Sequence, residues 1–247
     1  MNNLELAKKH KEIAEKYNTI YMWGCFGMPV TEQIIQEKTK QYPNWYNANR
    51  QYMYRNCIGK NVFGFDCVNL TKGILWGWNG DTTKRYGGAK YASNGVPDTT
   101  ADGMIANCRE VKTTDWKNMM IGEGLWLPGH WGLYIGDGLA VECTPAWKNC
   151  VQITAVGNIG TKPGYNTRTW HKHGKLPYVT YVNSADNIPD KNGQIIVNNK
   201  TYPIDRVLVS GTNYVKVRDF VDVLREADVC ELEVGFKGNI ATLTSKK

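Results

Sequence analysis

A cysteine and a histidine in two separate segments are the residues of this 247-residue chain whose types and surroundings could do chemistry. Cys67 ends the block Gly64-Phe65-Asp66-Cys67 and directly precedes an apolar run with helical spacing. His130 begins a strand-like run that ends at an Asp-Gly turn, and Glu142 lies on the following strand-like run. We therefore predict a hairpin over residues 126–144 that presents His130 and Glu142 side by side.

These residue types can together supply a nucleophile and a general acid–base. A free cysteine has a pKa of about 8.5, which a helix N-terminus and a nearby imidazolium can lower to roughly 3.5–7.5. We expect a resting thiolate at Cys67, with His130 giving a proton to a leaving amine and Glu142 orienting the imidazole. The alternative is that Cys67 is a small buried residue of a helix, as free cysteines often are.

Three blocks in this order resemble the NlpC-type cell-wall cysteine peptidases, which have a compact papain-like fold. They are Tyr21-Met22-Trp23-Gly24, Phe65-Asp66-Cys67 and the run from Gly129-His130-Trp131 to Asp137-Gly138. The resemblance spans residues 1–182 and is similar in detail to bacteriophage endolysins of clostridial type. It implies an α+β domain in which a nucleophile helix packs on an antiparallel sheet, with Cys67, His130 and Glu142 as the catalytic residues.

Two further residues take roles from the same resemblance. It places the Tyr21 hydroxyl beside the nucleophile, where the hydroxyl would stabilise an oxyanion together with the backbone N–H of Cys67. A core tyrosine bonded to the backbone is the alternative. Asp66 would contact a substrate amine, or it would only cap the helix that follows, since aspartate is among the preferred N-cap residues.

The resemblance implies a thiol hydrolase of peptidoglycan that cleaves an amide of the stem peptide by acyl transfer to Cys67. The γ-D-glutamyl linkage to the diamino acid is the first expected bond, and the N-acetylmuramoyl–L-alanine amide is the alternative. A non-catalytic cell-wall-binding protein and a lipid acyl transferase are the alternatives from other classes. No cofactor or metal is expected, because the pair His171 and His173 lacks further ligand spacing and is interpreted as exposed.

Charge and cysteine content agree with a wall substrate. The net charge is +7, and residues 1–182 alone contain 21 Lys and Arg against 14 Asp and Glu, which favours an anionic polymer such as teichoic-acid-bearing peptidoglycan. Nucleic acid is not an expected partner, since no nucleic-acid motif is present. Seven cysteines, an odd number without C-x-x-C spacing, predict free thiols rather than a disulfide framework or a zinc site.

The first twenty residues read as an amphipathic helix rather than a signal peptide. No segment reaches the roughly 18 apolar residues that a membrane span needs. We therefore expect synthesis in the bacterial host cytoplasm without a signal peptide, no stable membrane insertion, and action on the cell wall after release, as in bacteriolysis by a phage.

The remaining pattern predicts the order of elements in residues 1–182. We expect a helix over residues 3–17 and an insertion over residues 29–62 that forms a lid or wall of the cleft. A glycine-rich, irregular stretch then runs to Gly122, and strands follow near residues 150–156 and 177–182.

A polar, turn-rich linker is predicted at residues 183–192, before a small α+β module at residues 193–247. Its strand, turn, strand and helix order, with the helix over residues 218–227, resembles the stalk-type repeat domain at the start of copper amine oxidases. No copper chemistry follows, because the histidine ligands are absent from this segment. The module is expected to bind the wall or, alternatively, to assemble the chain into a homo-oligomer.

Overall fold

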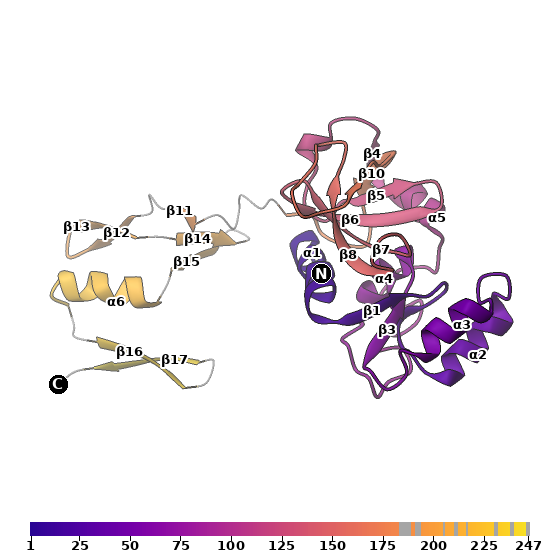
Figure 1. The fold of residues 1–247 in the computed structure, drawn as a ribbon. Helices are drawn as coiled ribbons and strands as arrows, with labels where there is room; N and C mark the ends of the chain where they lie inside the picture. Colours follow the sequence, from indigo (N-terminus) through magenta and orange to yellow (C-terminus); the bar gives the residue numbers. More distant parts are fainter. Residues whose placement is uncertain are drawn as a thin grey trace. The chain divides into compact units, whose positions relative to one another are not determined.

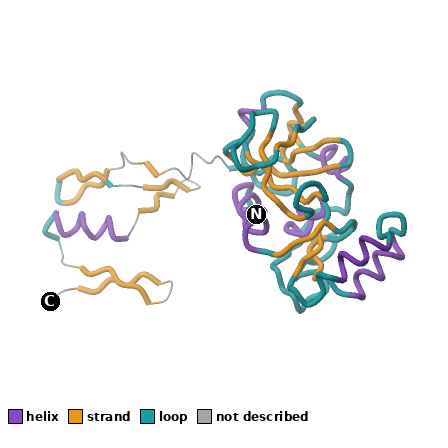
Figure 2. Tube along the Cα trace, in the orientation of Figure 1, coloured by secondary structure: helices purple, strands orange, loops and turns teal. Residues whose placement is uncertain are grey.

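The structure is a computed structural model that describes residues 1–182, 189–190, 194–204, 206–209, 212–215, 217–229, 232–237 and 240–245. The chain divides into two compact units, Met1–Tyr181 and Val182–Lys247. Each unit mixes helices and strands (Figures 1 and 2), so the α+β class is confirmed. Among the described residues, no helix combines the length and apolar composition that crossing a bilayer requires.

The first unit contains five α-helices and ten strands among its described residues. The helices are α1 (Asn3–Lys16), α2 (Glu32–Gln41), α3 (Ala48–Arg55), α4 (Cys67–Leu75) and α5 (Ala101–Asn107), with a 3₁₀ turn at Trp116–Asn118. The strands are β1 (Asn18–Tyr21), β2 (Phe26–Pro29), β3 (Val62–Phe65), β4 (Arg109–Lys112), β5 (Gly124–Leu127), β6 (His130–Gly136), β7 (Leu139–Thr144), β8 (Cys150–Val156), β9 (Thr167–Arg168) and β10 (Lys172–Lys175).

Seven of these strands form one sheet in the order β4-β10-β5-β6-β7-β8-β9, which curls into a half-barrel (Figure 1). The predicted hairpin is β6 and β7, and its register sets Gly132 opposite Glu142. His130 is two residues from Gly132, so it shares a sheet face with Glu142 and is its diagonal neighbour. The two side chains therefore meet, although they are not directly opposite.

Helix α4, which begins at Cys67, is the buried centre of this unit. All nine of its residues are buried, and it packs against α1, β2, β6 and β7. Gly73 permits this packing, because a Cβ there would stand 2.4 Å from the carbonyl oxygen of Phe26. The first turn of the helix is thereby held against the two strands of the hairpin.

A second sheet, in the order β1-β3-β2, leads into the start of α4. Strands β1 and β3 are parallel, and their register pairs Tyr21 with Phe65. The parallel pairing places Tyr21 level with the end of β3, one residue before Asp66. Two blocks that are far apart in the sequence thus lie side by side.

Some predicted elements are correct and others are wrong. Helix α1 and strand β8 lie where they were expected. Residues 177–182 are wrong as a strand: they form a turn in which only Thr180 makes a β-bridge, to Asn2. The Tyr181 hydroxyl there donates to the carbonyl of Gly122, which turns this segment inward. The stretch before Gly122 is less irregular than predicted, because it contains α5 and β4.

The described part of the second unit has seven strands and one helix, and three of the strands after the predicted linker, β14, β16 and β17, were not predicted. Its elements are β12 (Gln194–Val197), β13 (Lys200–Pro203), β14 (Arg206–Val209), β15 (Thr212–Val215), α6 (Val217–Glu226), and the unpredicted hairpin β16 (Leu232–Lys237) and β17 (Ile240–Ser245). Strand β11 (Pro189–Asp190) pairs with β14 and lies inside the predicted linker, the rest of which is outside the described residues. The turn between β12 and β13 is the expected one, since Asn198 and Asn199 both have positive φ, as a two-residue hairpin turn requires.

Candidate active site

Cys67 is the first residue of α4, and its sulfur lies against the start of β6. The Sγ atom is 4.0 Å from the carbonyl oxygen of Gly129, and the backbone N–H of Trp131 is close enough to stabilise a charge on the sulfur. Gly129 and Trp131 flank His130 in the chain, so the fold brings the two predicted segments together. Within the described residues, no hydrogen bond joins the thiol to the imidazole.

The expected resting thiolate is not what the surroundings of Cys67 favour. Burial raises the pKa of the Cys67 thiol to about 12, and the neighbouring Asp66 carboxylate raises it further. The N–H groups of Val68, Trp131 and Cys67 itself lower the pKa, but they offset only part of this effect. The helix end does not compensate, because Asp66 already places a negative charge there. These surroundings favour the thiol over the thiolate.

His130 and Glu142 form a hydrogen-bonded pair across the hairpin. The Nε2 atom of His130 is 2.7 Å from Oε2 of Glu142, and the glutamate is fully buried. Burial alone would raise the pKa of Glu142, but its hydrogen bonds and the nearby positive charges outweigh burial and lower the pKa. A charged carboxylate makes Nε2 the donor, which leaves Nδ1 of the neutral ring as the basic nitrogen. No hydrogen-bond partner is found for Nδ1 in the part of the chain described.

Arg168 and Thr154 are polar members of this site that the sequence did not reveal. The Nε–H of Arg168 donates to Glu142 Oε2 at 2.6 Å, on the same oxygen that binds the imidazole. The Thr154 hydroxyl donates to Oε1 at 2.7 Å. Both carboxylate oxygens are therefore held, and the negative charge of Glu142 is shared between an imidazole and a permanent cation.

Trp170 fixes the plane of the imidazole. Its ring stacks on the His130 ring with a centroid separation of 5.6 Å and an interplanar angle of 7°. Gly132 provides the space for it, because a Cβ at Gly132 would lie 2.7 Å from the Trp170 ring. With Nε2 held by Glu142 and the ring held by stacking, Nδ1 has a defined direction.

Tyr21 is buried at the end of β1, level with Phe65 and therefore near the start of α4. Burial raises the pKa of Tyr21, and the charges of Cys67 and Asp66 raise it further. Its ring packs on Trp45 with a centroid separation of 5.5 Å. Among the described residues its hydroxyl has no hydrogen-bond partner, so the alternative of a core tyrosine bonded to the backbone does not apply.

Asp66 caps helix α4, one of the two roles expected for it. One carboxylate oxygen accepts the N–H of Asn69 at 2.8 Å, and the other accepts Asn69 Nδ2 at 2.6 Å and the N–H of Gly24 at 2.8 Å. Helix α4 thus begins with an aspartate cap. Both oxygens bind amides of the protein, so Asp66 positions the start of α4; its contact with a substrate amine stays a prediction.

The two histidines of the candidate metal pair, His171 and His173, lie in different environments. His173 is buried rather than exposed: Nδ1 is 2.5 Å from Glu123, and Nε2 is 2.8 Å from the carbonyl oxygen of Thr114. His171 is exposed. In the described part of the chain no group of three or more His, Cys, Asp or Glu could hold a metal.

The six cysteines described are free thiols, and Cys230 lies outside the described residues.

Comparison of the chain with protein-family models, with curated proteins and with solved structures finds no match.

Proposed function

We propose that this protein is a cysteine hydrolase that cleaves an amide bond in the stem peptide of bacterial peptidoglycan, with Cys67 as the nucleophile. The observation that carries this proposal is the arrangement around His130. One ring nitrogen is fixed on a buried carboxylate, the other has no partner among the residues that the structure describes, and the Cys67 sulfur lies beside the backbone of the two residues that flank the histidine. This combination is what an activated thiol needs.

The chemistry follows from a neutral resting pair. As the sulfur attacks the amide carbon, its proton moves to Nδ1 of His130, and Glu142 stabilises the resulting imidazolium. The oxyanion that forms can accept hydrogen bonds from the Tyr21 hydroxyl and from the N–H groups of Cys67 and Val68, which the first turn of a helix leaves without intrahelical partners.

The second half of the reaction returns the site to its starting state. His130 gives its proton to the leaving amine, the C–N bond breaks, and a thioester on Cys67 remains. Water then loses a proton to His130 and attacks the thioester, which releases a carboxylic acid and the thiol. Atoms and charges balance with water as the only co-substrate, and no cofactor is required.

The proposed substrate class rests on the three sequence blocks that resemble NlpC-type peptidases, together with the positive charge of residues 1–182. The papain-like arrangement and the endolysin-like role are part of the same proposal. The γ-D-glutamyl–diamino acid bond is the first candidate, and the muramoyl–L-alanine amide is the second.

The test is digestion of purified peptidoglycan, followed by mass spectrometry of the soluble muropeptides. We expect the wild-type protein and Cys150→Ala to release products of one stem-peptide cleavage, and Cys67→Ala to release none. Cys150 is a suitable control because it is a half-buried cysteine at the start of β8, and its pKa responds to burial and to Lys148 rather than to the site. Wall binding without any cleavage by the wild type would favour the non-catalytic wall-binding alternative.

A further inference from the structure

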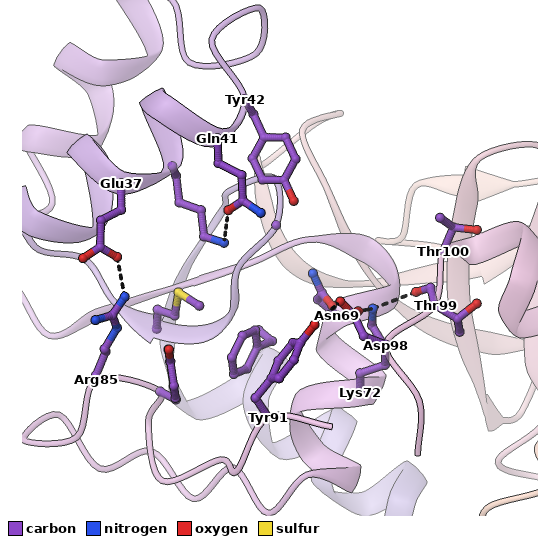
Figure 3. A pocket seen from close by; sticks show the side chains of 15 residues that line it. Glu37, Gln41, Tyr42, Asn69, Lys72, Arg85, Tyr91, Asp98, Thr99 and Thr100 are labelled. Atoms are coloured by element: carbon purple, nitrogen blue, oxygen red, sulfur yellow. Dashed lines mark hydrogen bonds and ion pairs between the residues drawn. The ribbon is translucent and has the colours of Figure 1, made fainter. Parts of the chain in front are cut away.

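A large polar cavity lies behind the start of α4, and the site described above does not use it. Its volume is about 640 Å³, and its walls come from α2, α4 and residues 85–100 (Figure 3). Gly24 and Asn69 form part of the wall, and both donate hydrogen bonds to Asp66, the residue before Cys67. The cavity thus adjoins the nucleophile end of the helix. The insertion at residues 29–62, which supplies α2, forms one of its walls.

The charged side chains that line the cavity include more cations than carboxylates. Three cations, Lys38, Lys72 and Arg85, face two carboxylates, Glu37 and Asp98. Arg85 pairs with Glu37 at 2.5 Å. Lys72 pairs with Asp98 and also donates to a carbonyl oxygen at 2.7 Å, while the second oxygen of Asp98 accepts a tyrosine hydroxyl at 2.6 Å. Both carboxylates are therefore engaged, and one cation remains.

The remaining cation, Lys38, is a buried ammonium with only neutral partners in contact. The residue is 9% exposed, its Nζ donates to Gln41 Oε1 at 2.9 Å, and it lies 5.6 Å from the centre of the Tyr42 ring. Within the described residues it has no carboxylate at ion-pair distance. The Asp66 carboxylate does not line the cavity, and both of its oxygens accept amide N–H groups. Asp98 has the opposite charge and interacts with Lys38 through space, but it bonds directly to Lys72 and a tyrosine hydroxyl. An anion that entered the cavity and contacted Lys38 would therefore be stabilised.

We propose that this cavity binds a carboxylate of the substrate, with Lys38 as its counter-ion, and that the preferred substrate is therefore an acidic peptide with a free carboxyl group. This inference rests on the proposed function. One unpaired positive charge suits a monoanion. Arg85, whose guanidinium could favour a phosphate, already pairs with Glu37 through one of its nitrogens. Amide and hydroxyl groups of Asn69, Thr99 and Tyr42 line the same space, and they can bind the polar remainder of a peptide.

The test measures binding by calorimetry in the Cys67→Ala background, in which turnover is removed. The probes are a disaccharide-tripeptide muropeptide with free carboxyl groups and the same compound with its carboxyl groups amidated. We expect Lys38→Met to weaken binding of the free acid by about tenfold, the loss of one charge-assisted hydrogen bond, and to leave binding of the amide unchanged. Lys40→Met, an exposed lysine on the same helix, is the matched control and should bind both probes as the parent does.

Three outcomes separate this inference from the function on which it rests. Equal affinity of the parent for the free acid and the amide would overturn the carboxylate site, and this comparison needs no Lys38 variant to fold. A different result would be that the parent binds poly(glycerol phosphate) and that Lys38→Met abolishes this binding without changing the affinity for the muropeptide. That result would assign the cavity to a phosphodiester and would overturn the proposed carboxylate site. Failure of the wild type to cleave either muropeptide would count against the proposed function, whatever the binding results.

Discussion

Two histidine–glutamate pairs lie in the first unit, and they differ in what the second ring nitrogen does. His130 holds Glu142 through Nε2, and its Nδ1 has no partner among the described residues. His173 holds Glu123 through Nδ1, but its Nε2 is 2.8 Å from the carbonyl oxygen of Thr114. A carbonyl only accepts, so that nitrogen carries a proton.

The difference shows that a buried carboxylate does not by itself make a histidine a base. At His173 burial alone would lower the pKa, but the bonds to Glu123 and Thr114 outweigh burial and raise it, so the doubly protonated ring is favoured. That ring has no lone pair to accept a proton, and it packs on Trp116 with a centroid separation of 4.8 Å. His130 keeps one nitrogen open beside the Cys67 segment, and that open nitrogen distinguishes the reactive pair from the structural one.

The largest effect that separates the two pairs is on turnover. We expect His130→Ala to reduce kcat on soluble muropeptides by about a thousandfold, because general acid–base catalysis is lost. His173→Gln should retain most of the turnover and should instead lower the melting temperature, since it removes a buried ion pair. Steady-state kinetics and thermal unfolding of both variants make the comparison. Similar losses of kcat in the two variants would contradict the claim that the open Nδ1 of His130 distinguishes the reactive pair from the structural one.

A smaller effect is expected from the carboxylate of the reactive pair. Glu142→Gln should cost roughly tenfold in kcat and Glu142→Ala roughly a hundredfold, because an amide oxygen can still accept the imidazole N–H whereas alanine cannot. The control is Glu110→Gln, an exposed glutamate on β4 that pairs with Lys175. Unchanged activity in both Glu142 variants would show that another group orients the imidazole.

Arg168 should set the pH range rather than the rate. It shares the Glu142 oxygen that binds His130, so its removal leaves the full carboxylate charge to stabilise a protonated imidazole. We expect Arg168→Met to move the acid limb of the pH–kcat profile upward by on the order of one pH unit, while kcat at the optimum changes little. A profile that moves downward, or a uniform loss of kcat at every pH, would contradict this role.

The smallest effect is on the pH dependence of stability. A raised pKa means that His173 stabilises the fold fully below the unfolded-state value of about 6.5, and that this contribution is lost as pH rises through the folded-state pKa. His10 acts in the opposite window: burial lowers its pKa to about 4, so its contribution is lost as pH falls from about 6.5 toward that value. Denaturant unfolding across pH should therefore show that His173→Gln flattens only the arm above about pH 6.5. If His173→Gln instead flattened the stability profile below about pH 6.5, the raised pKa assigned to His173 would be wrong.

Local patterns in the sequence predicted the elements that carry Cys67, His130 and Glu142. An aspartate cap before an apolar run indicated α4, and an Asp-Gly turn between two apolar runs indicated the hairpin of β6 and β7. In both cases the signal lies within a few residues of the element. The resemblance then supplied Tyr21, which the parallel pairing of β1 and β3 places level with Phe65.

Groups that reach the site from distant segments could not be predicted. Arg168 and Trp170 follow a loop without periodicity, and Arg168 belongs to a strand of two residues, which is too short to leave a pattern. The thiolate expected at Cys67 is disfavoured by burial, and burial is a property of the packed helix rather than of its sequence. The burial of Lys38 could not be predicted for the same reason. A lysine in a polar helix such as α2 is expected to be exposed, and tertiary packing buries this one.

The most direct measurement is the location of the acyl group during turnover. Wild-type protein mixed with a soluble muropeptide and quenched in acid should carry a covalent adduct with the mass of the acyl fragment. Mass spectrometry of its peptides should place that adduct on Cys67, through the thioester that the proposed chemistry requires. An adduct on Cys143, which is buried with its thiol 3.3 Å from the carbonyl oxygen of Phe65, or on any residue other than Cys67, would contradict the assignment of the nucleophile.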